Sequence, residues 1–125
     1  MTSNYFPESA PTAEQKILDG CANLAGSMLG GVRYTAVHEI GHWLDLFHTF
    51  QGNSCSGPGD FIPDTPRQLN ATGGCPAKSD TCPNQPGNDP IHNFMDYSTD
   101  ICMTELPRFQ SVRMLWMYAK MRFGR

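Results

Sequence analysis

The middle of this 125-residue chain has many turn-forming residues and too few apolar ones to hold itself together. From Gly52 to Asp100 it is rich in Gly, Pro, Asn and Asp, which predicts coil with short extended pieces. Four cysteines allow three disulfide pairings, and disulfides indicate an oxidising compartment. A four-cysteine zinc site is the alternative, but the sequence contains no CxxC pair. We expect a loop-rich region that is cross-linked by two disulfides, with Cys21 left unpaired. The disulfides would be formed by Cys55, Cys75, Cys82 and Cys102.

Two histidines stand four residues apart ahead of this region, in the sequence His38-Glu39-Ile40-Gly41-His42. Residues i and i+4 share one face of a helix, so both imidazoles can bind one metal ion. Glu39 is rotated about a quarter turn away and can reach a metal-bound water without being a ligand. Zinc lowers the pKa of such a water to about 7, so the pattern predicts a zinc site with Glu39 as base. A half-buried helix that happens to contain two histidines is the alternative.

Three helices are expected, two before the coil and one after it. They cover residues 11 to about 19, about 34 to 44, and about 107 to 122. In the second helix we expect a buried apolar side, opposite the histidines, formed by Ala36, Ile40, Trp43, Leu44 and Phe47. In the last helix we expect inward packing by Val112, Leu115, Trp116 and several methionines.

Size and charge limit the classes of partner. The length suits a single domain over residues 1–125, with a short N-terminal segment, 1–33, and a main part, 34–125. A net charge of -3 argues against a nucleic-acid or anionic-membrane partner. No apolar run approaches the roughly 20 residues of a membrane span. Met1 to Pro11 is polar and lacks the apolar region of a signal peptide. We expect a monomer.

Several ordered motifs carry a family resemblance. The sequence from His38 to His48 resembles the long zinc signature HExxHxxGxxH of the metzincin peptidases. Its continuation, His48-Thr49-Phe50-Gln51-Gly52 and then Pro63-Asp64-Thr65-Pro66, resembles the pappalysin (cytophagalysin-like) family of secreted metalloendopeptidases. The sequence from Asn93 to Ser98, NFMDYS, is similar to that family's Met-turn. The resemblance implies an α+β, metzincin-like zincin, of which this chain has mainly the helical and loop-rich lower part, with little sheet.

The resemblance also implies roles for individual residues. It implies a secreted zinc-dependent endopeptidase that hydrolyses protein or peptide substrates through a water activated by Glu39. Tyr97 would approach the metal or the transition-state oxyanion, and Met95 would form the floor below the zinc. The implied zinc ligands are His38, His42 and His48; the candidate calcium ligands are Asp60, Asp64 and Thr65; the implied disulfides are Cys55–Cys82 and Cys75–Cys102.

Two departures from the family favour an alternative, a zinc-stabilised module with weak or no catalysis. Only 37 residues precede His38, too few for the twisted sheet and backing helix that metzincins place there. Asp45 stands where the signature has a glycine in a left-handed conformation, which aspartate adopts at a cost of roughly 1 kcal/mol. His48 can then still reach the metal. If the helix instead continues, Asp45 lies on the metal face and could itself be a ligand.

Overall fold

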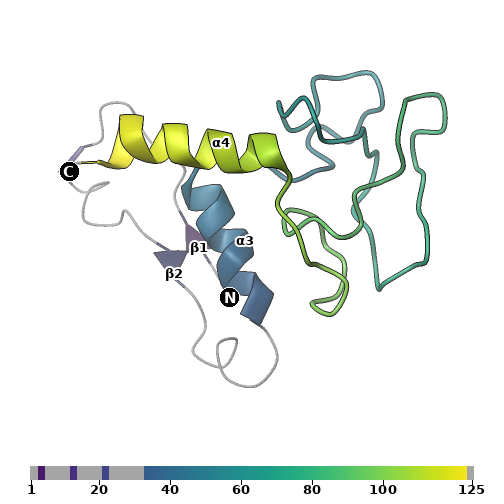
Figure 1. Ribbon diagram of the computed structural model, residues 1–125, viewed down its shortest axis with the longest axis horizontal. Coiled ribbons are helices and arrows are strands. Elements are labelled where there is room, and N and C mark those ends of the chain that lie inside the picture. The colour runs from purple at the N-terminus through teal and green to yellow at the C-terminus, as the bar shows by residue number, and fades with distance from the viewer. Residues whose placement is uncertain (1–2, 5–11, 14–20, 23–32, 124–125) are drawn as a thin grey trace. The chain divides into compact units, whose positions relative to one another are not determined.

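The computed structural model describes residues 3–4, 12–13, 21–22 and 33–123. The elements in this part are β1 (Ser3–Asn4), β2 (Cys21–Ala22), α3 (Arg33–Trp43), α4 (Arg108–Met117) and a π-helix, η1 (Tyr118–Arg122) (Figure 1). β1 and β2 pair antiparallel, with Ser3 opposite Ala22. Apart from residues 12–13, the helix expected over residues 11–19 lies outside the described residues, as does the side chain of Cys21. The expected class, helix and loop with little sheet, is confirmed.

Chain contacts divide the molecule into two compact units, residues 1–46 with 112–125, and residues 47–111. The second unit is coil and turn from residue 47 to 107, as the Gly- and Pro-rich sequence predicts, and Figure 1 shows no helix or strand there. The expected division into segments 1–33 and 34–125 stays a prediction. Among the described helices, none has the length and apolar character needed to cross a lipid bilayer.

Buried carboxylates organise the coil of the second unit. Asp96 is almost fully buried and accepts hydrogen bonds from the Thr72 backbone N–H and from Gln68 Nε2, both at 3.0 Å. Asp89 is buried as well and accepts from the Ser79 hydroxyl and from both the N–H and the hydroxyl of Thr81. These carboxylates satisfy donors that a sheet would otherwise pair, which explains how a segment without regular structure can be buried.

Two disulfides close this unit, and they join the pairs that the family resemblance implies. Cys55 is bonded to Cys82 and Cys75 to Cys102, with Cα–Cα distances of 5.5 and 5.4 Å. Each closes a loop of 27 residues, and the two loops interleave. In the chain-entropy model, such a loop stabilises the folded state by about 3–4 kcal/mol.

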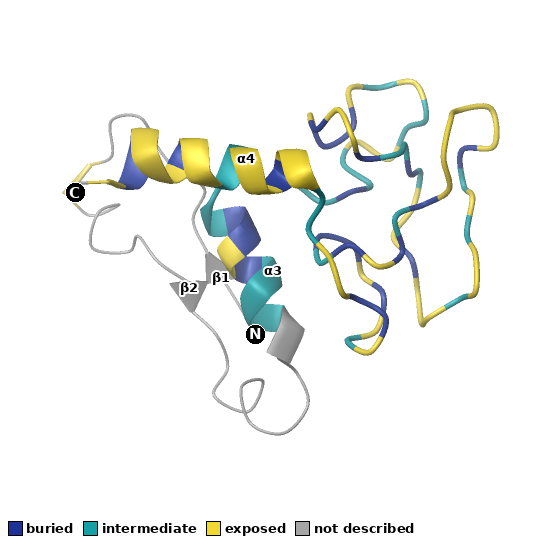
Figure 2. Ribbon diagram, viewed as in Figure 1, coloured by how far each residue is buried: buried dark blue, intermediate teal, exposed yellow. Residues whose placement is uncertain are grey.

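The last helix buries a different side from the one expected. Gln110, Met117 and Met121 are buried, whereas Val112, Leu115 and Trp116 are exposed, Leu115 to 71% (Figure 2). At about 100° per residue, these three lie on the side opposite Gln110 and Met117. The expectation of inward packing for them is therefore wrong. Polar contacts determine the rotation of the helix, because the side chain of Arg113 bonds to Asp45 on the buried side.

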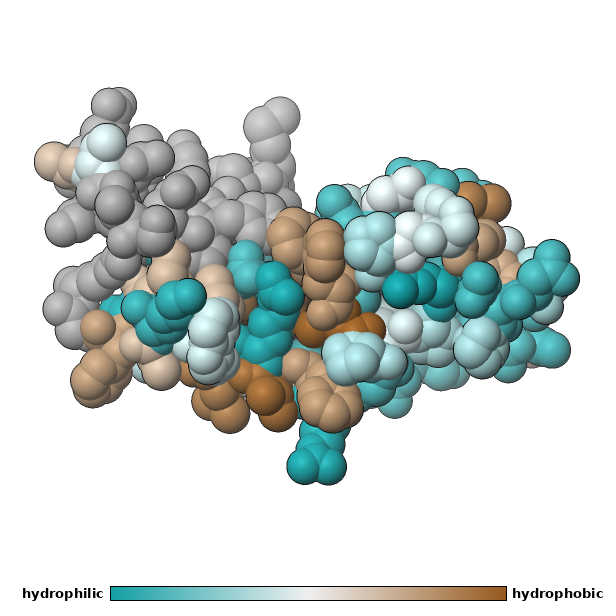
Figure 3. Space-filling model, turned by 90° about the horizontal axis from the view of Figure 1, so that it is seen from above, coloured by the Kyte–Doolittle hydropathy of each residue, from teal (hydrophilic) through white to brown (hydrophobic). Residues whose placement is uncertain are grey.

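The apolar side expected for α3 is also only partly buried. Ile40 is 43% exposed, while Glu39, Gly41 and His42, on the histidine side, are buried. The prediction of a helix from 34 to 44 agrees with the observed bounds within a residue at each end, but its most buried residues lie on the histidine side. The exposed large hydrophobic residues include Ile40, Phe61, Ile101 and Leu115. Figure 3 shows hydrophobic patches among polar ones on the face that it draws.

Removing either disulfide should destabilise the second unit. We expect the paired substitution Cys55→Ser with Cys82→Ser to lower the free energy of unfolding by about 3–4 kcal/mol in urea titrations. The control is reduction of the wild-type chain, which should cost at least as much. A loss below about 1 kcal/mol would show that the buried carboxylates hold this coil without the bridge.

Candidate metal centre

The zinc-signature helix ends in a Schellman motif. The N–H of Asp45 donates to the His42 carbonyl, and the N–H of Leu46 donates to the Gly41 carbonyl, both at 2.9 Å. These are the two bonds of that motif, in which the residue after the cap takes a left-handed conformation. That residue is Asp45, with φ of 70°. The prediction that aspartate adopts the glycine conformation here is confirmed, and the chain turns instead of continuing the helix.

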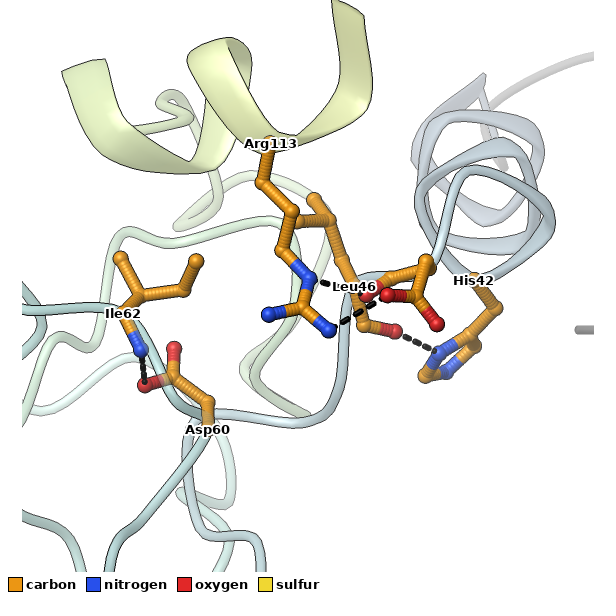
Figure 4. A network of polar contacts seen from close by, with 6 residues as sticks. His42, Leu46, Asp60, Ile62 and Arg113 are labelled. Carbon is orange, nitrogen blue, oxygen red and sulfur yellow. Dashed lines mark hydrogen bonds and ion pairs between the residues drawn. The ribbon is translucent and has the colours of Figure 1, made fainter. Parts of the chain in front are cut away.

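Arg113 holds Asp45 in this conformation. Its Nη2 donates to Asp45 Oδ2 and its Nε to the Asp45 carbonyl oxygen at 2.8 Å (Figure 4). The two side chains are only 27% and 16% exposed. After solvent screening, such a pair contributes about 1 kcal/mol, comparable to the cost of a left-handed aspartate. The alternative that Asp45 is a ligand in a continued helix is wrong, because the helix has ended and Arg113 occupies its carboxylate.

The turn also orients His42. His42 Nδ1 lies 2.7 Å from the Leu46 carbonyl oxygen (Figure 4). A carbonyl can only accept, so Nδ1 carries the proton and Nε2 presents its lone pair. The pKa of His42 is lowered by burial and, to a smaller extent, by neighbouring His38, whereas the bond to Leu46 and the charge of Glu39 oppose the shift. His42 is therefore held as a neutral imidazole, the form that binds metals.

The three histidines of the signature come together within eleven residues of chain. His42 Nε2 lies 3.0 Å from His38 Nε2, and one ligand nitrogen each of His38, His42 and His48 lies within 4.8 Å of the others. Tetrahedral zinc with nitrogen ligands needs nitrogens about 3.3 Å apart, so a small adjustment of one ring suffices. Three imidazoles, with the buried carboxylate Glu39 next to His38 in the sequence, form a donor set that suits zinc.

Two aromatic side chains contact His48 in the second unit. The ring of Phe50 stacks on it at 4.8 Å between centroids, and Tyr97 meets it edge-on at 4.9 Å. Tyr97 is 56% exposed, so its hydroxyl can face solvent or a bound molecule. The family resemblance predicts a role for Tyr97 beside the metal, and the structure places Tyr97 against the third histidine of the signature.

The Met-turn is tied to the residue that follows His48. The N–H of Thr49 donates to the Met95 carbonyl at 3.2 Å, and Met95 is fully buried. The turn itself is closed by Asn93, whose Oδ1 accepts the N–H of Met95 at 2.9 Å. The segments that carry His48 and Met95 are therefore bonded to each other through the backbone.

The candidate calcium loop brings two of its three predicted residues together. Asp60 and Thr65 are buried, and neither Asp60 Oδ2 nor Thr65 Oγ1 makes a hydrogen bond of good geometry. Burial raises the pKa of Asp60, although Thr65, the Ile62 N–H and Gln110 oppose the shift. Asp64 differs: it is exposed, and its Oδ2 accepts the N–H of Phe109 at 3.2 Å.

Sequence reasoning missed the residues that support the site. Arg113 is 68 residues from Asp45 in sequence, and no local pattern pairs them. Gln110 is fully buried beside Asp60, and no sequence pattern indicates its burial. Phe50 belongs to the family motif that begins at His48, but nothing in this motif indicates that its ring stacks on His48. The one available signal was Asp45 itself, since a charged residue at a left-handed position calls for a partner.

The sequence of this chain is similar to those of known proteins. The family model described as pregnancy-associated plasma protein-A, of the M43 peptidases, matches residues 4–118. An extracellular metalloprotease of Pyricularia oryzae is 51% identical over 127 residues, covering 97% of this chain and 44% of the relative. One of Verticillium alfalfae is 58% identical over 108 residues, covering 82% and 39%. This chain therefore spans less than half the length of these relatives.

Solved structures of mirolysin are similar to this chain in both fold and sequence. Mature mirolysin of Tannerella forsythia, in complex with a cleaved peptide, is 35% identical with a TM-score of 0.72, covering 94% of this chain and 47% of that one. Mirolysin in complex with compound 9 is 34% identical with a TM-score of 0.76, covering 98% and 49%. The fold described above is thus part of a mirolysin-like metzincin fold, and the chain belongs to the M43, pappalysin-like family of metalloproteases.

Proposed function

We propose that this chain carries the zinc site of a secreted metalloendopeptidase. The observation that carries the proposal is the meeting of His38, His42 and His48, with buried Glu39 next to His38 in the sequence. Zinc, when bound, would supply Lewis acidity toward a peptide carbonyl and its attacking water. Two disulfides and the extracellular metalloproteases among the relatives support secretion. The substrate class is a protein or peptide, and we expect the chain to be a monomer.

Two side chains of the protein would have different roles in peptide hydrolysis. The Glu39 carboxylate accepts a proton from the attacking water and returns it to the leaving amine nitrogen. Its burial keeps it beside the reacting atoms and strengthens its interaction with developing charge. The hydroxyl of Tyr97, whose ring contacts His48, would donate a hydrogen bond to the oxyanion that forms from the carbonyl.

Substitution of Glu39 should strongly reduce catalysis without abolishing zinc binding. We expect about one zinc per chain by metal analysis, lost in His38→Ala and His42→Ala. Glu39→Gln should keep zinc but reduce cleavage of a quenched fluorescent peptide by at least about 100-fold, because the general base is removed. The matched control is Glu105→Gln, an exposed glutamate whose substitution should leave the rate unchanged.

Each outcome decides between the two hypotheses for the site. Zinc retention in the His38→Ala/His42→Ala double variant would overturn the assignment of the ligands. Wild-type protein that binds zinc tightly and cleaves nothing would support the alternative, a zinc-stabilised module without catalysis.

We also propose that calcium binds the loop at Asp60 and Thr65. Two buried oxygens without a well-formed hydrogen bond, one of them from a carboxylate, are the kind of ligand that this hard cation prefers. Gln110 is buried against the same carboxylate, and its side-chain amide also lacks a well-formed hydrogen bond, so its Oε1 would be a third protein ligand. A cation there would compensate the burial that raises the pKa of Asp60.

Asp60→Asn should reveal this site through stability. Asn keeps an acceptor for the Ile62 N–H but carries no charge. Without calcium, the variant should unfold at a higher temperature than wild type at pH 7. A raised pKa means that the folded state favours the protonated acid. The contribution of Asp60 to folding stability is therefore fully present below pH 3.8 and is lost as the pH rises through the pKa of the folded state. The advantage of Asn should therefore shrink as pH falls.

Calcium should make the wild type more stable than the Asp60→Asn variant, the reverse of their order without calcium. Saturating calcium stabilises whichever chain binds it, by about 2.7 kcal/mol at 100 times Kd. We expect this gain in wild type and in the control Asp80→Asn, an exposed aspartate, but not in Asp60→Asn. Equal shifts in all three would place calcium elsewhere, and no shift in wild type would refute the site.

A further inference from the structure

We propose that Arg113 is a positioning residue for the metal centre, acting through the turn at Asp45. The inference rests on the proposed zinc site and names a residue outside the set of metal ligands. Arg113 makes two contacts with one residue: Nη2 to Asp45 Oδ2 and Nε to the Asp45 carbonyl oxygen. It therefore fixes both the side chain and the backbone of the residue at the centre of the Schellman turn.

Two metal ligands depend on that turn. Leu46, next to Asp45, supplies the carbonyl that fixes the tautomer and orientation of His42. Its own N–H closes the turn on the Gly41 carbonyl, and its side chain is fully buried. The reversal of the chain at Asp45 also brings His48, three residues further on, within reach of His38 and His42. If Asp45 left the left-handed region, both the Leu46 carbonyl and His48 would move.

A glycine at position 45 would need no such support. Glycine adopts positive φ about as readily as negative φ, whereas aspartate needs outside help to stay there. Arg113 gives that help through a planar fork with two donors at fixed spacing, which a lysine cannot reproduce. The chain thus combines a non-glycine residue at the turn with a distant arginine that holds it there.

A second arginine provides an internal comparison. Arg122 also holds the end of α3: its Nη2 donates to the Trp43 carbonyl at 2.9 Å, and its guanidinium lies 4.3 Å from the centre of the Trp43 ring. Arg122 therefore anchors the same helix end through Trp43, two residues before the centre of the turn. A role specific to the turn should distinguish Arg113 from Arg122.

The test is a double-mutant cycle read by zinc affinity. Zinc Kd would be measured by chelator competition for wild type, Asp45→Gly, Arg113→Ala and the double variant, with Arg122→Ala in both backgrounds as the control. We expect Arg113→Ala to weaken zinc about tenfold when residue 45 is Asp, and about threefold or less when it is Gly. Arg113→Lys should fall between wild type and Arg113→Ala. Arg122→Ala should change Kd by the same factor in both backgrounds.

A second readout needs no zinc. In the metal-free protein, nitrogen-15 NMR should show His42 with its proton on Nδ1, protected by the bond to Leu46. Arg113→Ala should abolish that protected signal with Asp at position 45 and retain it with Gly. This measurement applies also to Arg113→Lys, should Arg113→Ala fail to fold.

The outcomes separate the inference from the proposed function. Equal losses of zinc affinity in the wild-type and Asp45→Gly backgrounds would overturn the inference, because they would make Arg113 a general anchor like Arg122. Wild-type zinc binding with no effect of Arg113→Ala would overturn it too, while leaving the zinc site intact. A wild-type chain that binds no zinc yet shows the coupled His42 signal would refute the zinc site and support the positioning role.

Discussion

The Schellman turn at Asp45 and Leu46 is the local structure on which the metal centre depends. It ends α3 one residue after His42, supplies the carbonyl that fixes the His42 ring, and directs the chain so that His48 meets the two helical histidines. These consequences follow from a single residue with φ of 70°. In most such turns glycine makes that conformation inexpensive; here an arginine 68 residues away offsets the cost.

Beyond the turn, the chain is ordered by covalent and polar links more than by regular structure. Residues 47–107 form no helix, and the described strands contain two residues each. Interleaved disulfides reduce the entropy of the unfolded coil, and buried Asp89 and Asp96 satisfy its backbone donors. This scaffold carries Phe50, Tyr97 and the Met-turn around His48, so side chains far apart in sequence keep fixed positions without a sheet beneath them.

Much of this could be predicted because the signals are local. The spacing of His38 and His42 predicts a helix with both rings on one face, and the Gly- and Pro-rich stretch predicts coil. The burial of the helices could not be predicted that way. Apolar periodicity favours Ile40 and Leu115 as core residues, yet both are exposed. On α4, the less exposed side instead carries Gln110 and Arg113, which make polar contacts with residues far away in the sequence. Such contacts have no sequence periodicity.

The central claim is that the turn at Asp45 presents His48 as the third ligand of one zinc ion. X-ray absorption at the zinc edge of the loaded chain tests it directly, since bonds of about 2.0 Å to imidazole differ from those of about 2.3 Å to sulfur. We predict three imidazoles and one oxygen in wild type, and two imidazoles after His48→Ala. A wild-type spectrum with two imidazoles, unchanged by His48→Ala, or one containing sulfur, would contradict the account.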